Sequence, residues 1–229
     1  MFRKRRNQKR NYDIVFFSRP NSVFAEAYRK IPVNLEYANV DKKIKIIHIT
    51  SAMPGENKTT ISINLAATYA ELNKKVILID LDLRRPKIHR YFKVPNDHGL
   101  SSYLIDQLEY EQLIVGTEHG IDLITSGPKV PSPHVVLRSE KFQKLLEKLS
   151  EEYDYIIIDS PPVLLVTDSS ILTKYVDATL FVVNEKISRK KEVLSSIRLL
   201  KENNANIAGI IVTGKTPKNG YYYYRYNSY

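Results

Sequence analysis

The sequence predicts an α/β protein with an open, mostly parallel sheet flanked by helices. Short runs rich in Ile and Val alternate along the chain with helix-like stretches, and strands that alternate with helices are typical of a parallel sheet. The chain has 229 residues, 43% of them hydrophobic, which is enough to bury one substantial core. Strands are expected at residues 44–50, 76–80, 121–125, 155–159, 178–183 and 207–212.

The clearest helices are expected at residues 59–72, 134–150 and 188–203. The second has apolar residues at near-helical spacing, which indicates a stripe that packs on the core and is not itself a site. Residues 126–134 contain three prolines and cannot continue either a helix or a strand, so they are expected to form an ordered loop or turn. The apolar stripe consists of Val135, Val136, Phe142, Leu145, Leu146 and Leu149.

Composition indicates a single domain with a tail at each end. We expect a basic arm at residues 1–20, one domain at 21–214 and a flexible tyrosine-rich tail at 215–229. No apolar run approaches the roughly 20 residues that span a bilayer, and no signal peptide is apparent, so a cytoplasmic location is expected. The chain has no cysteine, which excludes disulfides and thiolate metal sites and leaves oxygen or histidine as metal ligands.

The net charge of +10 is uneven, because six cations and no acid stand among the first ten residues. Such an arm can attract anionic lipid head groups, bind nucleic acid or simply be solvated. All three interpretations stay open at this stage. The cations are Arg3, Lys4, Arg5, Arg6, Lys9 and Arg10.

A candidate phosphate loop, SAMPGENKTT, follows the first expected strand and precedes the first clear helix. Loop N–H groups, the helix N-terminus and Lys58 would surround the phosphates of ATP, while the Thr59 hydroxyl would bind Mg²⁺. The strand, loop and helix order predicts a P-loop NTPase-like fold. The nucleotide-binding candidates here are Gly55, Glu56, Asn57, Lys58, Thr59 and Thr60.

The loop departs from the usual pattern [AG]-x4-G-K-[ST] at one position. Ala52, Lys58 and Thr59 match, but Asn57 stands where glycine is expected. Asparagine is among the few residues that tolerate the left-handed backbone region, so the change is mild. Its side chain could also crowd the phosphate, and sequence reasoning leaves both outcomes open.

Three aspartates lie at the carboxyl ends of two expected strands, on the edge of the sheet that is expected to carry the phosphate loop. In an open parallel sheet, ligands bind beyond the carboxyl ends of the strands. Asp80 and Asp159 are expected to bind Mg²⁺, which prefers oxygen ligands. Asp82 is the candidate to orient or deprotonate a tyrosine hydroxyl, and with Lys58 these acids form the expected catalytic set.

The nearby Arg84 and Arg85 could stabilise phosphate charge. An ion pair with a surface acid is the alternative for at least one of them.

Six of the last nine residues are tyrosines. In an arbitrary protein such a tail suggests an aromatic end that self-associates. Next to a phosphate loop, it suggests instead that catalyst and substrate share one polypeptide. The expected phosphorylation sites are Tyr221, Tyr222, Tyr223, Tyr224, Tyr226 and Tyr229.

Over nearly its full length the chain resembles the bacterial tyrosine kinases of capsule and exopolysaccharide synthesis, which are deviant P-loop ATPases. The resemblance rests on SAMPGENKTT, VILIDLDLRRP, YIIIDSPPVLLVTDSS, SGPKVPSPHVVLRSEKF and the tyrosine tail, in this order. It implies ATP- and Mg²⁺-dependent autophosphorylation of the tail between subunits of a ring-shaped oligomer. It also implies a membrane-anchored activator that recruits the kinase to the membrane, a cognate tyrosine phosphatase and no nucleic acid partner.

Two further departures from the family pattern concern assembly and the base. The segment FAEAYRKIPVN resembles the family's oligomer-contact helix, with Glu26 and Arg29 in place, but Pro32 stands where a second arginine is usual. Proline in a helix interior is expected to kink or break it, unless the helix starts there. Thr213 occupies the position of an asparagine that contacts adenine in the family.

Two rival hypotheses remain beside autophosphorylation. One is a nucleotide-binding regulatory scaffold with impaired phosphotransfer, because three positions depart from the family pattern. The other is a partition-type ATPase that binds DNA or membrane through the basic arm. The second leaves the tyrosine tail unexplained.

Overall fold

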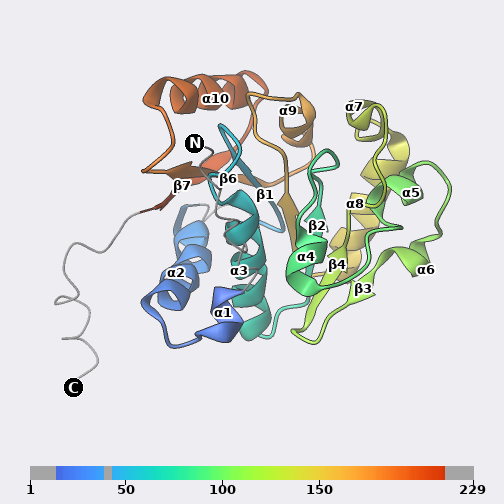
Figure 1. The fold of residues 1–229 in the computed structure, drawn as a ribbon, viewed down its shortest axis with the longest axis horizontal. Helices are drawn as coiled ribbons and strands as arrows, with labels where there is room; N and C mark the ends of the chain where they lie inside the picture. Colours follow the sequence, from blue (N-terminus) through green and yellow to red (C-terminus); the bar gives the residue numbers. More distant parts are fainter. Residues whose placement is uncertain (1–13, 39–42, 215–229) are drawn as a thin grey trace, which may run out of the picture.

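A seven-stranded sheet forms the centre of the computed structural model, which describes residues 14–38 and 43–214 (Figure 1). The strand order is β3-β4-β2-β5-β1-β6-β7, and all neighbouring pairs are parallel except β3 with β4. All six predicted strands are confirmed, and only the two-residue β3 was not predicted. The strands are β1 Ile46–Ser51, β2 Val76–Asp80, β3 Val115–Gly116, β4 Ile121–Ile124, β5 Tyr155–Asp159, β6 Ala178–Asn184 and β7 Ile207–Thr213.

Helices connect the strands and cover both faces of the sheet (Figure 1). The predicted helices at 59–72 and 188–203 are confirmed within two residues as α3 and α10. The helices are α1 Val15–Ser18, α2 Val23–Ala38, α3 Lys58–Glu71, α4 Ile88–Phe92, α5 Leu100–Leu104, α6 Tyr110–Leu113, α7 Pro133–Val136, α8 Glu140–Glu152, α9 Asp168–Leu172 and α10 Lys190–Glu202.

The prediction of one helix at 134–150 was wrong, because two helices occupy this stretch. The short α7 ends at Val136, and α8 begins after Ser139. The Ser139 hydroxyl accepts a hydrogen bond from the backbone N–H of Phe142, which satisfies a free donor of the first turn of α8. Five of the six residues of the predicted apolar stripe pack on the same core, Val136 from α7 and the other four from α8. Val135 is 58% exposed, so the prediction that it packs on the core was wrong.

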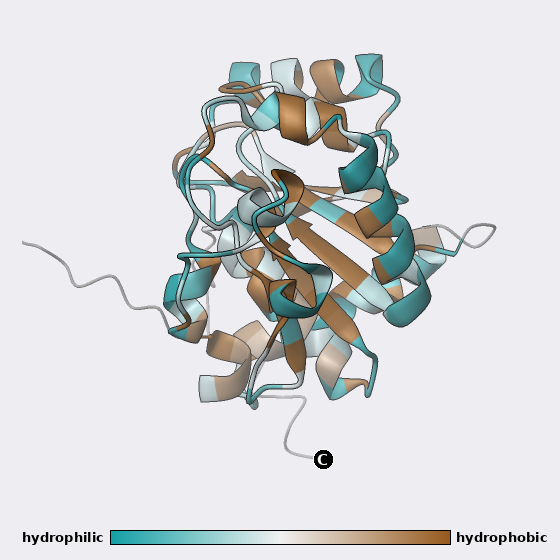
Figure 2. Ribbon diagram, turned by 90° about the vertical axis from the view of Figure 1, so that its right-hand side faces the viewer, coloured by the Kyte–Doolittle hydropathy of each residue, from teal (hydrophilic) through white to brown (hydrophobic). Residues whose placement is uncertain are grey.

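Alternate residues of the central strands pack on opposite faces of the sheet. In β2, Val76 and Leu78 belong to the cluster beneath α1, α2 and α3, whereas Ile77 and Ile79 belong to the cluster with Phe142 of α8. Figure 2 shows the strands as an apolar layer with helices on either side. This double burial explains why the strands read as continuous Ile and Val runs.

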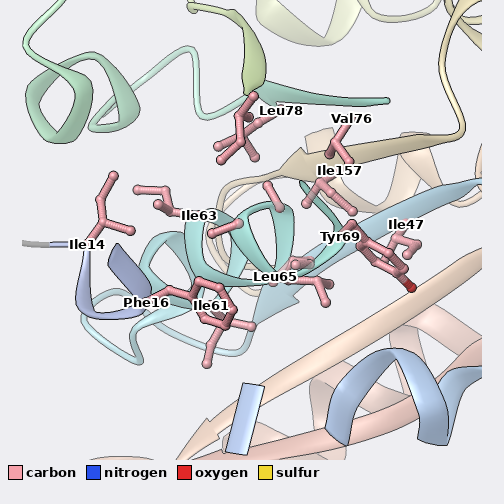
Figure 3. Packing of buried hydrophobic residues seen from close by; sticks show 14 of the residues in the cluster. Ile14, Phe16, Ile47, Ile61, Ile63, Leu65, Tyr69, Val76, Leu78 and Ile157 are labelled. Atoms are coloured by element: carbon pink, nitrogen blue, oxygen red, sulfur yellow. The ribbon is translucent and has the colours of Figure 1, made fainter. Parts of the chain in front are cut away.

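Helix α3 is buried along nearly its whole length, from Lys58 to Tyr69. Ile61, Ile63 and Leu65 are at most 3% exposed and pack between the sheet and the N-terminal helices (Figure 3). A helix enclosed on all sides has little freedom to shift. Its first turn, which follows the phosphate loop, is therefore held in place by the core.

The N-terminal boundary of the domain differs from the predicted one. Residues 15–18 form α1, and Phe16 is 2% exposed in the same core cluster as α3. The backbone N–H of Phe16 donates to Asn64 Oδ1 at 2.9 Å. The domain thus begins by Ile14, and the predicted arm overlaps it by seven residues. The six arm cations lie outside the described residues.

Helix α2 runs through Pro32 without a break, so the expected break is wrong, while a kink at Pro32 stays a prediction. Proline removes one helical hydrogen bond, but Pro32 itself is buried, and Ala25 and Leu35 of the same helix pack in the core. Tertiary packing therefore outweighs the local cost. In the described part of the chain, no helix is long and apolar enough to cross a membrane.

Candidate active site

The phosphate loop connects the end of β1 at Ser51 to the start of α3 at Lys58. Two of its residues have positive φ, Gly55 at 90° and Asn57 at 72°. With ψ at 18°, Asn57 lies in the left-handed region that asparagine tolerates better than most residues. The replacement of glycine by Asn57 is therefore compatible with the conformation of the loop.

The side chain of Asn57 reaches the end of β7. Its Nδ2 lies 3.4 Å from the hydroxyl of Thr213, and that hydroxyl lies 3.4 Å from the carbonyl oxygens of Glu56 and Val183. All three are long, weak hydrogen bonds. Thr213 thus lies against the phosphate loop, and its expected contact with adenine stays a prediction.

Two loop residues expected to bind nucleotide use their side chains within the protein. Glu56 is 1% exposed and accepts hydrogen bonds from the Met53 N–H at 2.8 Å and from the Ser188 hydroxyl. Thr60 is half-buried, with its hydroxyl 3.4 Å from that of Tyr91. At both positions the group left for a phosphate is the backbone N–H.

A buried charged cluster lies directly behind the loop. Lys58 Nζ is 3.1 Å from Asp82 Oδ2 and 3.5 Å from Asp159 Oδ1, and the three side chains are 7%, 8% and 1% exposed. Thr59 donates to Asp159 Oδ2 at 2.7 Å, and Ser62 donates to Asp159 Oδ1 at 3.2 Å. The structure therefore brings together four of the predicted site residues. Ser62 was missed, although it stands one helical turn after Lys58.

Asp80 lies at the end of β2 and shapes the turn that follows it. Its Oδ2 accepts the N–H groups of Lys87 at 2.9 Å and Ile88 at 3.0 Å, and its Oδ1 accepts that of Asp82 at 3.2 Å. Because the strand ends at Asp80, Asp82 does not share a strand face with it. The expected metal-binding role of Asp80 stays a prediction.

Burial and mutual repulsion perturb the ionisation of this cluster. Burial, followed by the charge of Asp159, raises the pKa of Asp80 to about 7. Burial also raises the pKa of Asp159, against the opposing effect of Lys58. Burial alone would lower the pKa of Lys58, but the negative charges of Asp159 and Asp82 outweigh this effect, so its pKa is raised. Three acids facing one lysine leave the cluster short of positive charge.

A single Mg²⁺ ion fits this shortage of positive charge. Mg²⁺ usually binds one or two carboxylates together with phosphate oxygens and water, rather than a cage made only of protein. Among residues 14–38 and 43–214, no group of three or more His, Cys, Asp or Glu side chains could hold a metal alone. Thr59 and Asp159, joined by a 2.7 Å hydrogen bond, form the kind of partial ligand set that Mg²⁺ completes with phosphate.

Of the two arginines that follow Asp82, Arg84 forms an ion pair. Its Nε lies 3.1 Å from Asp168 Oδ2. This confirms that at least one of the pair binds a carboxylate, although Asp168 is 1% exposed and is not a surface acid. The suggested role of Arg85 at a phosphate stays a prediction.

A buried polar network behind Asp159 was not predicted. His48, in the middle of β1, has Nε2 2.7 Å from the Ser160 hydroxyl and Nδ1 3.2 Å from that of Thr179. The hydroxyls of Ser160 and Ser169 lie 3.1 Å apart. Burial, with the charge of Lys58, lowers the pKa of His48 to about 3, so it is neutral. A lone histidine within the apolar run IIHIT was the only signal in the sequence.

The six tail tyrosines lie outside the described residues. The described chain ends at Gly214, one residue after β7. Their expected phosphorylation therefore stays a prediction.

The fold and the phosphate loop define a P-loop ATPase, and comparison with known proteins agrees with this class. Residues 44–208 match the family model described as AAA domain. The solved structure of cobyrinic acid a,c-diamide synthase from Mycobacterium smegmatis, with bound ATP analogue and magnesium, has a TM-score of 0.67 over 77% of each chain. At 19% identity this likeness concerns the fold alone.

Closer relatives narrow the class to one family. The chain is 36% identical to tyrosine-protein kinase YwqD of Bacillus subtilis over 93% of this chain and 90% of the relative. It is 34% identical to tyrosine-protein kinase etk of Escherichia coli over 92% of this chain and 29% of that longer relative. The chain belongs to the family of bacterial tyrosine-protein kinases.

Two solved structures match at a similar level. The kinase domain of E. coli tyrosine kinase ETK has a TM-score of 0.87 and 34% identity, covering 95% of this chain and 86% of that one. The chimerical protein CapA2B2 has a TM-score of 0.85 and 35% identity, covering 88% of this chain and 89% of that one. The kinase fold predicted from the sequence is therefore confirmed.

Proposed function

We propose that this kinase transfers the γ-phosphoryl group of ATP to tyrosines of its own C-terminal cluster and thereby regulates capsular or exopolysaccharide synthesis. The observation that carries the proposal is the Lys58 ammonium held 3.1 Å from Asp82 and 3.5 Å from Asp159, behind a phosphate loop. A cation, a loop of free N–H groups and carboxylates are the parts that phosphoryl transfer requires.

The nucleotide site is assigned to the loop and the end of β7. Backbone N–H groups from Gly55 to Thr60 and the side chain of Lys58 would hold the phosphates, and Thr213 would lie toward the base. Thr59 and Asp159 would hold Mg²⁺, with Asp80 close behind them. When bound, the ion supplies positive charge that neutralises the phosphate oxygens.

Asp82 is assigned to the tyrosine substrate. In the structure its carboxylate is paired with Lys58. Phosphate oxygens of ATP would compete for Lys58 and leave Asp82 free to accept a proton. The tyrosine oxygen then forms a bond to the γ-phosphorus, the bond to the bridging oxygen breaks, ADP leaves with the electron pair and the phenolic proton passes to Asp82. A strong base is not needed, because positioning and charge neutralisation supply most of the acceleration.

Transfer is proposed to occur between subunits of a ring-shaped oligomer. The tail at 215–229 spans at most about 50 Å when extended, which is enough to enter a neighbouring subunit. Helix α2, with Glu26 and Arg29, is the proposed contact between subunits. Arg29 binds Glu71 of its own chain at 2.8 Å, so assembly would have to share or replace this pair.

A membrane-anchored activator and a cognate tyrosine phosphatase are the proposed partners. The likeness to the chimerical protein CapA2B2 supports the first of these. Recruitment by such a partner would place the kinase at the inner face of the membrane. The proposal includes no nucleic acid partner.

The test is incubation of the purified chain with Mg²⁺ and γ-labelled ATP, followed by mapping of phosphotyrosine by mass spectrometry. Label is expected on Tyr221 to Tyr229 and should be lost in Lys58→Ala. The matched control is Lys74→Ala, which removes an exposed lysine beyond the far end of α3 and should keep the label. Circular dichroism checks that both variants are folded.

A chain that binds ATP but incorporates no label, even with the cytosolic segment of its activator, would contradict the proposal. That result would favour a nucleotide-binding scaffold. Label that is equally strong in Lys58→Ala would instead contradict the assignment of the site.

A further inference from the structure

A pocket apart from the phosphate loop lies between the segment that follows β5, the connection between α7 and α8, and helices α9 and α10. It has a volume of about 720 Å³, within the range of sites that bind small molecules. Arg138 and Lys174 lie on its wall, together with the apolar side chains of Leu164, Leu165 and Tyr175. No aspartate or glutamate is among the residues that line it. The pocket is thus both cationic and apolar.

Three side chains of this pocket, those of Arg138, Lys174 and Ser170, are without hydrogen-bond or ion-pair partners in the described part of the chain. Arg138 and Lys174 are exposed, and the side chain of neither forms a hydrogen bond or ion pair with another described residue. Ser170 is 8% exposed, yet its hydroxyl has no hydrogen-bond partner among residues 14–38 and 43–214. A buried hydroxyl without a partner is costly, so a ligand in the pocket that accepts a hydrogen bond from Ser170 would remove this cost.

The apolar wall is also unusual for a free surface. Leu165 is 52% exposed and Leu164 is 36% exposed, and the two are consecutive in the chain. Single exposed leucines need no explanation, but adjacent ones beside two unpaired cations fit a ligand with an apolar body and an anionic end. A doubly charged phosphate on an aromatic ring has this combination, and arginine and lysine are the residues that recognise it.

We propose that this pocket binds a phosphotyrosine side chain, with Arg138 and Lys174 contacting the phosphate, the Ser170 hydroxyl donating to it and the leucines covering the ring. The ligand is the product of the kinase, so the inference rests on the proposed function. The source of the ligand is the phosphorylated tail of this chain, in the same or a second copy.

The pocket is joined to the phosphate loop by backbone hydrogen bonds. The N–H of Val163 donates to the carbonyl of Ser51 at 2.9 Å, and that of Leu164 donates to the carbonyl of Ala52 at 3.4 Å. The segment that forms the apolar wall is therefore bonded to the loop that holds ATP. Product bound in this pocket would contact a segment that supports catalysis.

The test is fluorescence anisotropy with labelled synthetic peptides of residues 218–229, added to the purified full chain without ATP. Six versions each carry phosphate on one tyrosine, and a seventh carries none. At least one phosphopeptide is expected to bind about tenfold or more tightly than the unphosphorylated peptide. Phenyl phosphate should displace it at lower concentration than inorganic phosphate, because only the former has a ring.

Variants locate the binding site. Arg138→Gln with Lys174→Gln should weaken phosphopeptide binding about tenfold or more, and Ser170→Ala should weaken it by a smaller factor. The matched control is Lys129→Gln with Lys191→Gln, which also removes two positive charges, but from exposed positions that do not line the pocket. This control should bind the phosphopeptide as the unaltered chain does.

Equal binding of phosphorylated and unphosphorylated peptides would overturn the proposal. Equal affinity in the pocket variant and the control would do the same, and equal displacement by the two phosphates would show a general anion site. Because the peptides are synthetic and no ATP is present, these results do not depend on kinase activity. Failure of this inference is thus distinguishable from failure of the proposed function, which the labelling experiment reports.

Discussion

The two ends of helix α3 carry similar charged groups in opposite environments. At its start, Lys58 is 3.1 Å from Asp82 and 3.5 Å from Asp159, with side chains at most 8% exposed. At its end, Glu71 is 2.8 Å from Arg29, with side chains 41% and 29% exposed. The distances alone would rank the surface pair as the stronger. Because the Lys58 cluster is buried, however, removing one of its charges should destabilise the fold more than removing one charge of the exposed pair.

At the buried end of α3, removal of one charge is energetically costly, and the same charged groups are the ones proposed to act in catalysis. Charges removed from water are stable only together, so Lys58 and its carboxylates are held as a set until phosphate and a metal ion compete for them. The exposed end is hydrated in any arrangement, so Arg29 can exchange partners at little cost. A catalytic cluster thus belongs at the buried end, and an exchangeable contact belongs at the exposed end.

The largest expected effect is the loss of the cation at the buried end. Lys58→Met keeps the apolar stem but leaves three buried aspartates without their lysine, and should lower the free energy of unfolding by about 3–5 kcal/mol. Urea denaturation at pH 8 measures this loss. The matched change at the other end is Arg29→Met. Equal losses in the two variants would show that burial does not set the cost of removing the cation.

The two ends should also respond to pH with opposite signs. Because the pKa of Asp80 is raised from 3.8 to about 7, the folded chain keeps a proton that the unfolded chain releases near pH 4. Its contribution to stability is present below pH 4 and is lost as the pH rises through 7. The pKa of Glu71 is lowered by its hydrogen bond to Arg29, so its contribution is present above pH 4.5 and is lost on acidification.

Urea denaturation at pH 5 and pH 8 tests this sign for Asp80. The unaltered chain should lose more stability between these pH values than Asp80→Asn does. His48, whose neutral form is buried, contributes in the opposite direction but is present in both proteins and cancels. A loss in Asp80→Asn as large as in the unaltered chain would show that Asp80 is ionised throughout.

An asparagine with positive φ stands at each end of α3 and allows a further test of how the two ends differ. Asn57 precedes α3 at φ 72° and Asn73 follows it at φ 55°, so glycine should fit both positions and stabilise the chain by about 0.5–1 kcal/mol at most. Only Asn57→Gly should change nucleotide affinity or kinase rate, because only Asn57 contacts Thr213 beside the loop. Thermal unfolding and the labelling assay separate the two effects.

The direction of the kinase change decides what Asn57 does. A marked increase in label for Asn57→Gly, absent in Asn73→Gly, would mean that the asparagine side chain impedes phosphotransfer. It would support the hypothesis that the unaltered chain is a nucleotide-binding scaffold with impaired phosphotransfer. An unchanged rate would mean that Asn57 replaces glycine without cost.

The smallest expected effect is the loss of the cation at the exposed end. Arg29→Met should reduce the free energy of unfolding by about 1 kcal/mol or less, because surface ion pairs are weak and methionine retains contact with the Phe16 ring. The loss should shrink further in 1 M salt. A loss above about 3 kcal/mol would show that the pair is not a surface pair in energetic terms.

Regular patterns in the sequence were sufficient to predict much of the fold. The Ile and Val runs predicted six strands, since a strand buried on both faces must be apolar throughout. The order of strand, loop and helix predicted where Lys58 and Thr59 would lie. Patterns shorter than a few residues carried too little information, which is why β3 and the break at Ser139 were not predicted.

The candidate site was predicted in its charged residues but not in its pairing. Strand ends placed Asp82 and Asp159 on one edge, yet nothing in the spacing showed that Lys58 would lie between them. His48 and Ser160 are 112 positions apart and meet only because β1 and β5 are neighbours in the sheet. Contacts of this kind depend on strand order, which local patterns do not encode.

The residues that could carry the chemistry were predictable from the sequence alone. The phosphate loop and the three aspartates can be recognised because their chemical types and their positions after strands follow from local geometry and charge, and the tyrosine tail can be recognised from its composition. How these groups are arranged depends on the packing of the whole chain. Burial turned Lys58, Asp82 and Asp159 into one interdependent cluster, carried α2 through Pro32, and left Arg138, Lys174 and Ser170 together around a pocket. Each of these outcomes depends on segments far apart in the chain being packed against one another, and packing is a property of the whole fold.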